Sequence, residues 1–322
     1  MLSNLLKNNF IAGAILMFLV VFALVFLPGG EVSSVEQGGL LFTTLFEHLE
    51  STISLRIFSA FFLLSSALLL NYIVLGMEVV SRPSFFPAFL YVIIGSETFM
   101  TFYFHPVIIA ALILLIALWR ILGSYRLDSA RAAVFDSAFF FSLATLFYPA
   151  CALLLPVFFI SLLVIRPYVW REWVFSFLGL CVPYFMAWSI LFLLGRLHLL
   201  SIHFSHFDFR LQWPVEVNLF GTIFMLLLCL YSVFAMVSGA AARKVRQQKN
   251  LSLFNYWLLF AFLSFLFVPS PPTAIPFLLV PALSVRLGEW LGEFRKNSWS
   301  DLVLFSITGC CAMCVLKIKG II

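Results

Sequence analysis

The sequence predicts an all-α, polytopic membrane protein with about eleven transmembrane helices, arranged as a single transmembrane domain over residues 1–322. Hydrophobic residues make up 63% of the chain and charged residues 10%, and the mean hydropathy is +1.11. Soluble domains are typically about 45–50% apolar and about 25% charged, so this composition excludes a water-soluble fold. The net charge of +5 does not indicate a nucleic-acid partner, because in a membrane protein an excess of Lys and Arg mainly sets the orientation of the chain in the membrane.

The predicted spans are apolar runs of about 20 residues, which is the length of helix that crosses a bilayer. The first run, 10–27, is too long for the core of a signal peptide and is followed by Pro28-Gly29-Gly30. We therefore expect an uncleaved first helix. The further single spans are 55–77, 84–101, 106–122, 173–195, 217–240, 251–268 and 299–316.

Two proline-containing regions need a different interpretation. Residues 133–165 are too long for one span, and Tyr148-Pro149 lies in the middle of the run. Proline removes a backbone donor and disfavours helix at the residue before it, so two short helices should meet there. Residues 274–290 are short and contain Pro276 and Pro281, which favours a kinked or partly re-entrant helix.

Alternating these spans from a cytoplasmic N-terminus places fourteen of the 19 basic residues on the inner side, a strong positive-inside signal. The C-terminus is then outside, together with all five histidines and the two long loops 29–54 and 196–216. Acids on the inner side are interspersed with arginine, which is typical of solvated loops. The six cysteines all lie within apolar runs, which favours free, buried thiols. We predict no cofactor.

The stretch HLLSIHFSHFDFRLQW, residues 198–213, contains three of the histidines. His203 and His206 share a helical face, and Asp208 adds an oxygen atom, so a zinc-like site is one interpretation. A second interpretation is an amphipathic helix on the outer leaflet, with its histidines toward water. The apolar face of that helix would consist of Phe204, Phe207 and Leu211. A third interpretation is a lid that contacts the substrate. We predict no structural metal, because the apolar face already accounts for the segment.

Acidic residues on the outer side are the candidate catalytic groups. In the loop 29–54, apolar residues at helical spacing predict an amphipathic helix whose protein- or lipid-facing side would be Leu40, Leu41, Thr44, Leu45 and Leu49. Glu47 and Glu50 then lie on a solvated face, or one of them lies at the mouth of a membrane cavity as a general base. In GSETFMTFYFHP, Glu97 ends one helix and His105 begins the next, either as an exposed turn or as a functional pair. Arg56, near the outer surface, suits a phosphate ligand.

The order of these features resembles the membrane core of the GT-C glycosyltransferases, which use polyprenyl-phosphate-linked sugars at the outer membrane face. The shared order is a first helix, a long acidic outer loop with an amphipathic helix, an acidic turn at 95–106, and the hairpin LATLFYPACALLLPVFFISLLVI followed by RPYVWRE. The segments NYIVLGMEVVSRPSFFPAFLYVIIGS and FYPACALLLPVFFISLLVIRPYVWREW also resemble an uncharacterised family of polytopic inner-membrane proteins of Bacteroidota.

The GT-C resemblance implies a catalytic acid soon after the first helix, which falls on Glu31, and a second acid, which falls on Glu97. Both positions carry Glu where the family usually has Asp. In a transferase, one of the outer acids would deprotonate the acceptor hydroxyl, and an arginine would hold the phosphate of the lipid donor. The candidate acids are Glu97, Glu31 and Glu47. The candidate substrate-binding residues are Arg56, His105 and Arg210.

A second class of function stays open beside the transferase. The chain is then a non-catalytic membrane scaffold, an accessory subunit, or a permeation path for lipid or solute. The predicted spans contain few polar residues, with Asn71 the main exception, and this disfavours an ion-coupled transporter. Under either class, the expected location is the inner membrane of the cell, with the N-terminus cytoplasmic and the C-terminus periplasmic. The expected partners are membrane lipids, including a polyprenyl-phosphate-linked sugar for the transferase.

Overall fold

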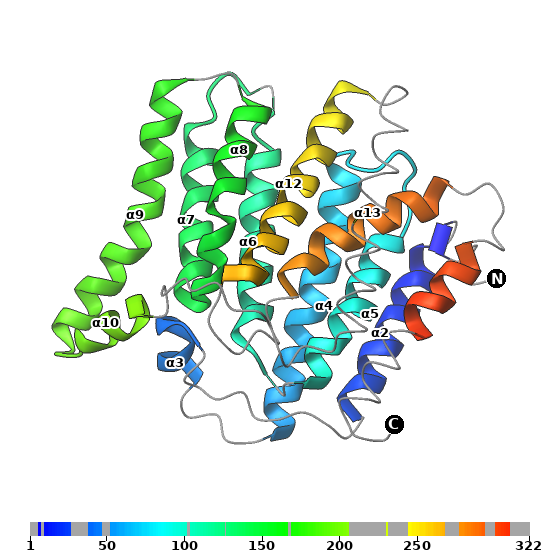
Figure 1. The fold of residues 1–322 in the computed structure, drawn as a ribbon, viewed down its shortest axis with the longest axis horizontal. Helices are drawn as coiled ribbons and strands as arrows, with labels where there is room; N and C mark the ends of the chain where they lie inside the picture. The colour runs from blue at the N-terminus through cyan, green and yellow to red at the C-terminus, as the bar shows by residue number, and fades with distance from the viewer. Residues whose placement is uncertain are drawn as a thin grey trace.

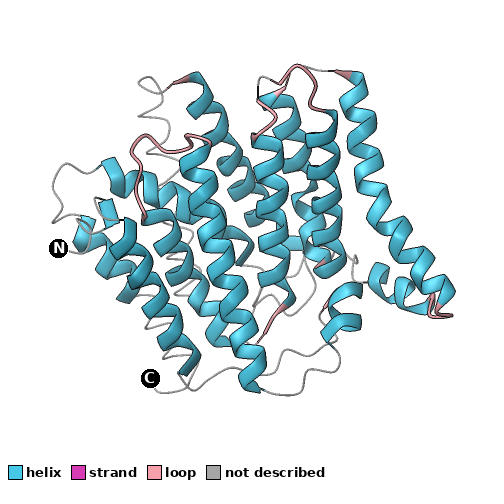
Figure 2. Cartoon of the chain, turned by 180° about the vertical axis from the view of Figure 1, so that it is seen from behind, coloured by secondary structure: helices cyan, strands magenta, loops and turns pink. Residues whose placement is uncertain are grey.

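The computed structural model describes residues 6–7, 10–26, 38–46, 52–101, 104–125, 127–166, 169–205, 230, 244–267, 277–293 and 300–309. All regular secondary structure in these ranges is helical (Figures 1 and 2). The principal elements are α2 (Phe10–Phe26), α3 (Leu40–Phe46), α4 (Thr52–Gly76), α5 (Phe86–Thr101), α6 (Pro106–Leu122), α7 (Arg131–Phe147), the 3₁₀ helix η2 (Pro149–Leu154), α8 (Leu155–Ile165), α9 (Trp170–Leu193), α10 (His198–Ser205), α12 (Val245–Phe267) and α13 (Val280–Glu293).

The long helices run side by side between two ends of one bundle (Figure 1). One end contains the C-termini of α4, α6 and α8 and the N-termini of α7, α9 and α12; we call it the basic end, because most of the described Arg and Lys residues lie there. The other end contains α3, α10 and the N-termini of α4 and α6, and we call it the histidine end after His105, His198 and His203. This separation of the helix termini matches the two sides predicted from the sequence.

The break predicted within residues 133–165 is confirmed. α7 ends at Phe147, and Tyr148 adopts an extended conformation with φ −143° and ψ 106°. Pro149 then occupies the first turn of η2, where the amide hydrogen that proline lacks would have no intrahelical acceptor. The chain reverses at this point, so α7 and α8 pack as two short antiparallel helices (Figure 1).

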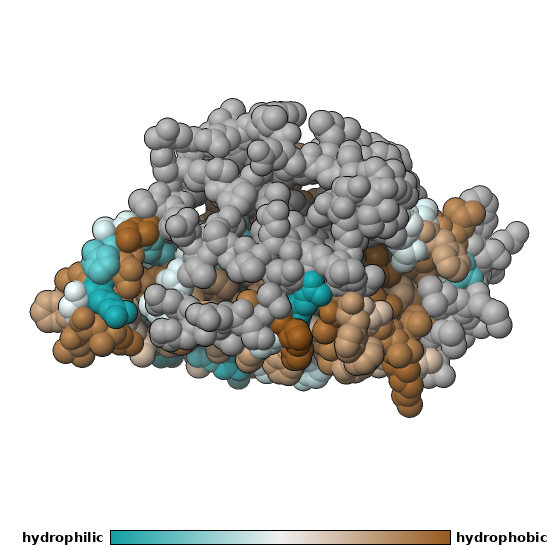
Figure 3. Space-filling model, turned by 90° about the horizontal axis from the view of Figure 1, so that it is seen from below, coloured by the Kyte–Doolittle hydropathy of each residue, from teal (hydrophilic) through white to brown (hydrophobic). Residues whose placement is uncertain are grey.

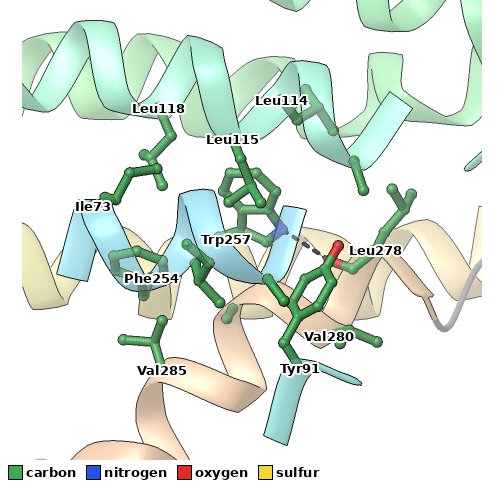
Figure 4. Packing of buried hydrophobic residues seen from close by; sticks show 14 of the residues in the cluster. Ile73, Tyr91, Leu114, Leu115, Leu118, Phe254, Trp257, Leu278, Val280 and Val285 are labelled. Carbon is green, nitrogen blue, oxygen red and sulfur yellow. Dashed lines mark hydrogen bonds between the residues drawn. The ribbon is translucent and has the colours of Figure 1, made fainter. Parts of the chain in front are cut away.

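In the second proline-containing region the predicted kink at Pro281 is wrong, and the partly re-entrant alternative stays a prediction. Pro281 lies in the first turn of α13, where a proline costs no helical hydrogen bond, so it begins the helix and does not kink it. Pro276 lies outside the described residues. α13 crosses α5 obliquely and closely, since a Cβ added at Gly288 would lie 2.8 Å from Pro87 (Figure 1). The 3₁₀ turn 277–279, directly before α13, is held by the indole of Trp257, whose Nε1 donates a hydrogen bond to the carbonyl oxygen of Leu278 at 2.8 Å (Figure 4).

Two helices are long and apolar enough to cross a membrane on their own, Ile53–Gly76 and Trp170–Leu193, among the residues that the structure describes. Five shorter apolar helices have 10–17 residues: Phe10–Phe26, Phe86–Ser96, Pro106–Leu122, Pro149–Ile165 and Ser300–Gly309. The predicted number of eleven spans therefore stays a prediction. α9 lies at the periphery, and only 28% of its most apolar window is buried against protein. Hydrophobic residues also predominate at both margins of the molecule seen from the histidine end (Figure 3).

At the basic end, the prediction of ordinary solvated acids is wrong for Glu172. This carboxylate is 3% exposed and binds the guanidinium of Arg166 through two hydrogen bonds, of 2.6 Å from Nη2 and 3.2 Å from Nε. It also accepts a hydrogen bond from the backbone amide of Ala130 at 3.3 Å. Arg166 in turn donates to the carbonyl oxygens of Ser124 and Leu127. The pair therefore joins the loop before α7 to the loop before α9.

Candidate functional site

The first amphipathic segment predicted in the loop 29–54 forms α3 at the histidine end. The amide of Gly39 donates a hydrogen bond of 2.8 Å to the carbonyl oxygen of Phe147, which seats α3 on the end of α7. Only glycine fits there, because an added Cβ would lie 2.3 Å from the carbonyl oxygen of Leu146. The side of α3 that packs on protein contains Leu40 and Phe42, whereas Leu45, predicted on the same face, is 61% exposed.

An aromatic cluster attaches α3 to the turn between α5 and α6. Phe104, in that turn, is 2% exposed. Its ring centroid lies 5.3 Å from that of Phe42 and 5.0 Å from that of Phe46, both in α3. On another side it stacks with Phe62 of α4 at 6.3 Å. The cluster places the α5–α6 turn, which follows Glu97, beside the N-terminal half of α4.

The second predicted amphipathic segment forms α10, but its orientation differs from the prediction. His203 is 2% exposed and does not face water; its Nδ1 accepts a hydrogen bond from the backbone amide of Leu40 at 3.4 Å. Phe204, predicted on the apolar face, is 52% exposed and stacks on Tyr184 of α9 at 6.0 Å, so its contact with the outer leaflet stays a prediction. α10 therefore packs on α3 as well as on α9. The other residues named in this stretch lie outside the described residues, namely His206, Phe207, Asp208, Arg210 and Leu211.

Hydroxyl groups join α7 to α9 beneath α10. The hydroxyl oxygens of Thr145 and Tyr184 are 2.9 Å apart, and Thr145 also donates to the carbonyl oxygen of Ser142 at 2.6 Å. The Ser142 hydroxyl donates to the carbonyl oxygen of Leu180 in α9 at 2.7 Å. The two helices approach so closely that a Cβ at Gly179 would lie 2.5 Å from a carbonyl oxygen of α7. The helices that carry α3 and α10 are therefore closely packed against each other.

His105 begins α6 as its N-cap. Its Nδ1 accepts a hydrogen bond from the amide of Val107 at 3.1 Å, Pro106 follows in the first turn, and the ring packs edge-on against Tyr148 at 5.5 Å. The side chain is 1% exposed, and this burial lowers the pKa of His105 to about 3, so the imidazole is neutral at pH 7. A polar residue directly before proline at the start of an apolar run is a helix N-terminal signal, which sequence reasoning did not use here.

The charged candidates can be placed in part. Arg56 lies in the second turn of α4, and its Nη1 donates a hydrogen bond of 3.4 Å to the carbonyl oxygen of Val25 at the end of α2. Glu97 lies in α5 one turn before the end of the helix at Thr101; its backbone is helical, and its side chain is outside the described structure. Arg56, Glu97 and His105 therefore lie at the same end of the bundle (Figure 1). Glu31 and Glu47 lie outside the described residues.

The histidine end is therefore an assembly of α3, α10, the α5–α6 turn, the α7–η2 turn and the N-terminal part of α4. Within the described ranges, no group of three or more His, Cys, Asp or Glu side chains is arranged to hold a metal ion. The described side chains of the assembly include one arginine, Arg56, at the N-terminus of the apolar helix α4. An arginine next to apolar helix surface suits a ligand with an anionic head and a hydrocarbon tail.

The fold is similar to that of ArnT from Cupriavidus metallidurans, whose crystal structure was determined bound to undecaprenyl phosphate. The two chains superpose with a TM-score of 0.61 at 14% identity, over 92% of this chain and 63% of that one. The predicted all-α membrane fold with a GT-C-like core is thereby confirmed. No family model matches the sequence, and no curated protein matches it, so the resemblance to a Bacteroidota family stays a prediction. The chain spans less than two thirds of the length of ArnT.

Proposed function

We propose that this membrane protein is a GT-C-like transferase that moves a sugar from a polyprenyl-phosphate carrier to an acceptor at the outer face of the inner membrane, in the assembly of envelope glycoconjugates. The observation that supports the proposal most directly is the fold shared with ArnT, a protein that binds undecaprenyl phosphate. The position of Arg56 and Glu97 at one end of the bundle agrees with it. A lipid donor stays in the bilayer, because extracting each CH₂ group costs about 0.8 kcal/mol. The reacting groups therefore have to lie at membrane depth.

In the proposed reaction, the carboxylate of Glu97 takes the proton of an acceptor hydroxyl. Glu31 and Glu47 are the other candidates for this base. The acceptor oxygen then forms a bond to the anomeric carbon of the sugar, and the bond from that carbon to the phosphate oxygen breaks. The bonding electrons leave with the polyprenyl phosphate, whose negative charge Arg56 or Arg210 stabilises. His105 shapes the site from the start of α6.

The proposed membrane orientation puts the basic end in the cytoplasm and the histidine end in the periplasm. Single cysteines at Lys244, which is 82% exposed at the basic end, and at Ser201, which is exposed in α10, test it. In a background without native cysteines, Ser201→Cys should react with an impermeant thiol reagent added outside intact cells. Lys244→Cys should react only after the membrane is opened. The reverse pattern would invert the orientation and place the candidate site in the cytoplasm.

The function itself is tested with the full chain in nanodiscs that contain a polyprenyl-phosphate sugar and candidate acceptors. Glu97→Gln should lower the rate about 10²–10⁴-fold, the usual contribution of a general base, while binding of undecaprenyl phosphate stays unchanged. Arg56→Ala should weaken that binding, and Arg56→Lys should restore part of it, because lysine keeps the charge but loses the two-pronged geometry. Asp128→Asn removes an exposed acid at the opposite end of the bundle and is the matched control.

A non-catalytic membrane subunit is the second candidate. It is favoured by the structural use of His105 and His203, both of which accept hydrogen bonds from backbone amides at helix N-termini. This alternative predicts full cellular function for Glu97→Gln and Glu31→Gln, singly and together, at normal protein abundance. That outcome, combined with no binding of undecaprenyl phosphate, would end the transferase proposal.

A further inference from the structure

A groove of about 480 Å³ lies between α6 and α7, towards the basic end and away from the candidate transferase site. Its apolar lining consists of Ile116, Phe135, Phe139 and Phe140, all partly exposed. The groove opens on the outside of the α6–α7 seam, since α7 turns Ser137 and Phe141 to its other side, against α8. Its position therefore gives it access to the lipid phase and not to the interior of the bundle.

The groove has a polar end and an apolar end. Arg120, in the last turn of α6, forms an ion pair with Asp136, in the second turn of α7. Both side chains remain about one-third exposed, at 38% and 32%. Ile116 lies one helical turn deeper on α6, and Phe140 one turn deeper on α7, towards the middle of the bundle. The charged pair is therefore at the depth of lipid headgroups, and the apolar surface continues at the depth of acyl chains.

Aromatic residues fix the guanidinium at the rim. The Arg120 guanidinium carbon lies 5.9 Å from the ring centroid of Trp119, within the range of a cation–π contact. Trp119 is itself held edge-on against Tyr72 of α4 at 6.1 Å. Tryptophan and tyrosine are enriched at membrane–water interfaces, which agrees with a headgroup level at this height.

We propose that this groove binds a glycerophospholipid whose headgroup carries both a phosphate and a primary ammonium, the chemistry of phosphatidylethanolamine. The ion pair has no net charge, so it offers no general attraction to an anionic lipid. It does present a positive and a negative group side by side, which a zwitterionic headgroup matches with its own phosphate and ammonium. A primary ammonium also donates hydrogen bonds to the Asp136 carboxylate, whereas a quaternary ammonium cannot. This inference does not depend on the transferase proposal.

The test uses the full chain purified from nanodiscs that contain equal amounts of phosphatidylethanolamine and phosphatidylglycerol, with retained lipids counted by native mass spectrometry. The native protein should retain phosphatidylethanolamine about tenfold over phosphatidylglycerol, a difference of about 1.4 kcal/mol. Asp136→Asn leaves the charge of Arg120 uncompensated, so it should abolish or reverse this preference. Asp128→Asn removes the same charge from the exposed loop between the two helices, and it should leave the preference intact.

A second variant distinguishes the loss of lipid binding from an effect of Asp136→Asn on folding. Ile116→Trp fills the apolar part of the groove and keeps the ion pair, so it should reduce the retention of phosphatidylethanolamine about tenfold in a monodisperse protein. Three results would each overturn the proposal. These are equal retention of the two lipids by the native protein, the same shift in Asp128→Asn as in Asp136→Asn, and unchanged lipid retention in Ile116→Trp.

Discussion

Replacing Glu172 by alanine should be among the most destabilising single substitutions in the chain. The change removes both hydrogen bonds from the guanidinium of Arg166, at 2.6 and 3.2 Å, and the 3.3 Å hydrogen bond from the amide of Ala130. Arg166 is 8% exposed, so water cannot replace the lost carboxylate without local opening. Breaking a buried pair by removing one partner typically costs about 3–5 kcal/mol, because a buried charge is left uncompensated.

The assay is unfolding of the full chain in mixed micelles, followed by tryptophan fluorescence, which gives a difference in the free energy of unfolding. Arg171→Ala is the matched control, because Arg171 is the exposed neighbour of Glu172 and contacts only the ring of Trp170 at 5.6 Å among the interactions described. Arg171→Ala should lower the free energy of unfolding by less than about 1 kcal/mol.

Replacing both members of the pair separates the loss of one charge from the loss of the whole interaction. The double variant Arg166→Met/Glu172→Leu should be more stable than Glu172→Ala, because no charge is left buried. A cost for Glu172→Ala as small as that for Arg171→Ala would refute the reasoning. So would a double variant less stable than the single one.

Three further substitutions probe strain, titration and close packing. Glu78 has a left-handed φ of 52°, and its ion pairs with Lys244 and Arg246 are long, at 3.9 and 4.0 Å, and at least one-third exposed. Glu78→Gly should therefore stabilise the protein by about 1 kcal/mol in the same assay, whereas Glu78→Ala should not. Burial holds the pKa of His105 near 3, below the value of 6.5 in the unfolded chain, so the free energy of unfolding should fall as the pH drops from 6.5 towards 3. Asparagine is a helix cap that does not titrate. His105→Asn should therefore make the melting temperature less dependent on pH over this range. Gly39→Ala should lower the free energy of unfolding by about 1–3 kcal/mol and should speed hydrogen exchange in α3. Gly76→Ala is the control and should have neither effect, because its added Cβ meets open space.

Most of the helices were predictable from the sequence, because the length of an apolar run and the residues that interrupt it are local properties. The run 106–122 has the bounds of α6, and the break at Tyr148-Pro149 is found where proline and the residue before it disfavour helix. The kink predicted at Pro281 was wrong, because the sequence does not show that a helix begins next to this proline. The turn before that helix is held by Trp257, which is distant in the sequence. Whether a proline starts or kinks a helix depends on where the preceding turn lies.

For three of the candidate residues, the shared end of the bundle was predictable from the sequence, and their contacts were not. Charge and histidine distribution placed Arg56, Glu97 and His105 on one side of the membrane, and they lie at one end of the bundle. The sequence did not reveal that His203 reaches the amide of Leu40, 163 positions earlier in the chain. It also placed His203 toward water, although this residue is 2% exposed and packs against protein.

The sequence by itself determined that this chain is a helical membrane protein, where most helices begin and end, and which polar groups share a side. These properties follow from hydropathy, proline and the distribution of charge along the chain. Only the tertiary structure decided which helix faces meet protein and which meet lipid, as in α10, and which charges are buried in pairs, as in Arg166 and Glu172. The physical reason is that lipid and protein interior are both apolar, so hydrophobic periodicity cannot distinguish them, and the choice depends on the packing of segments distant in the chain.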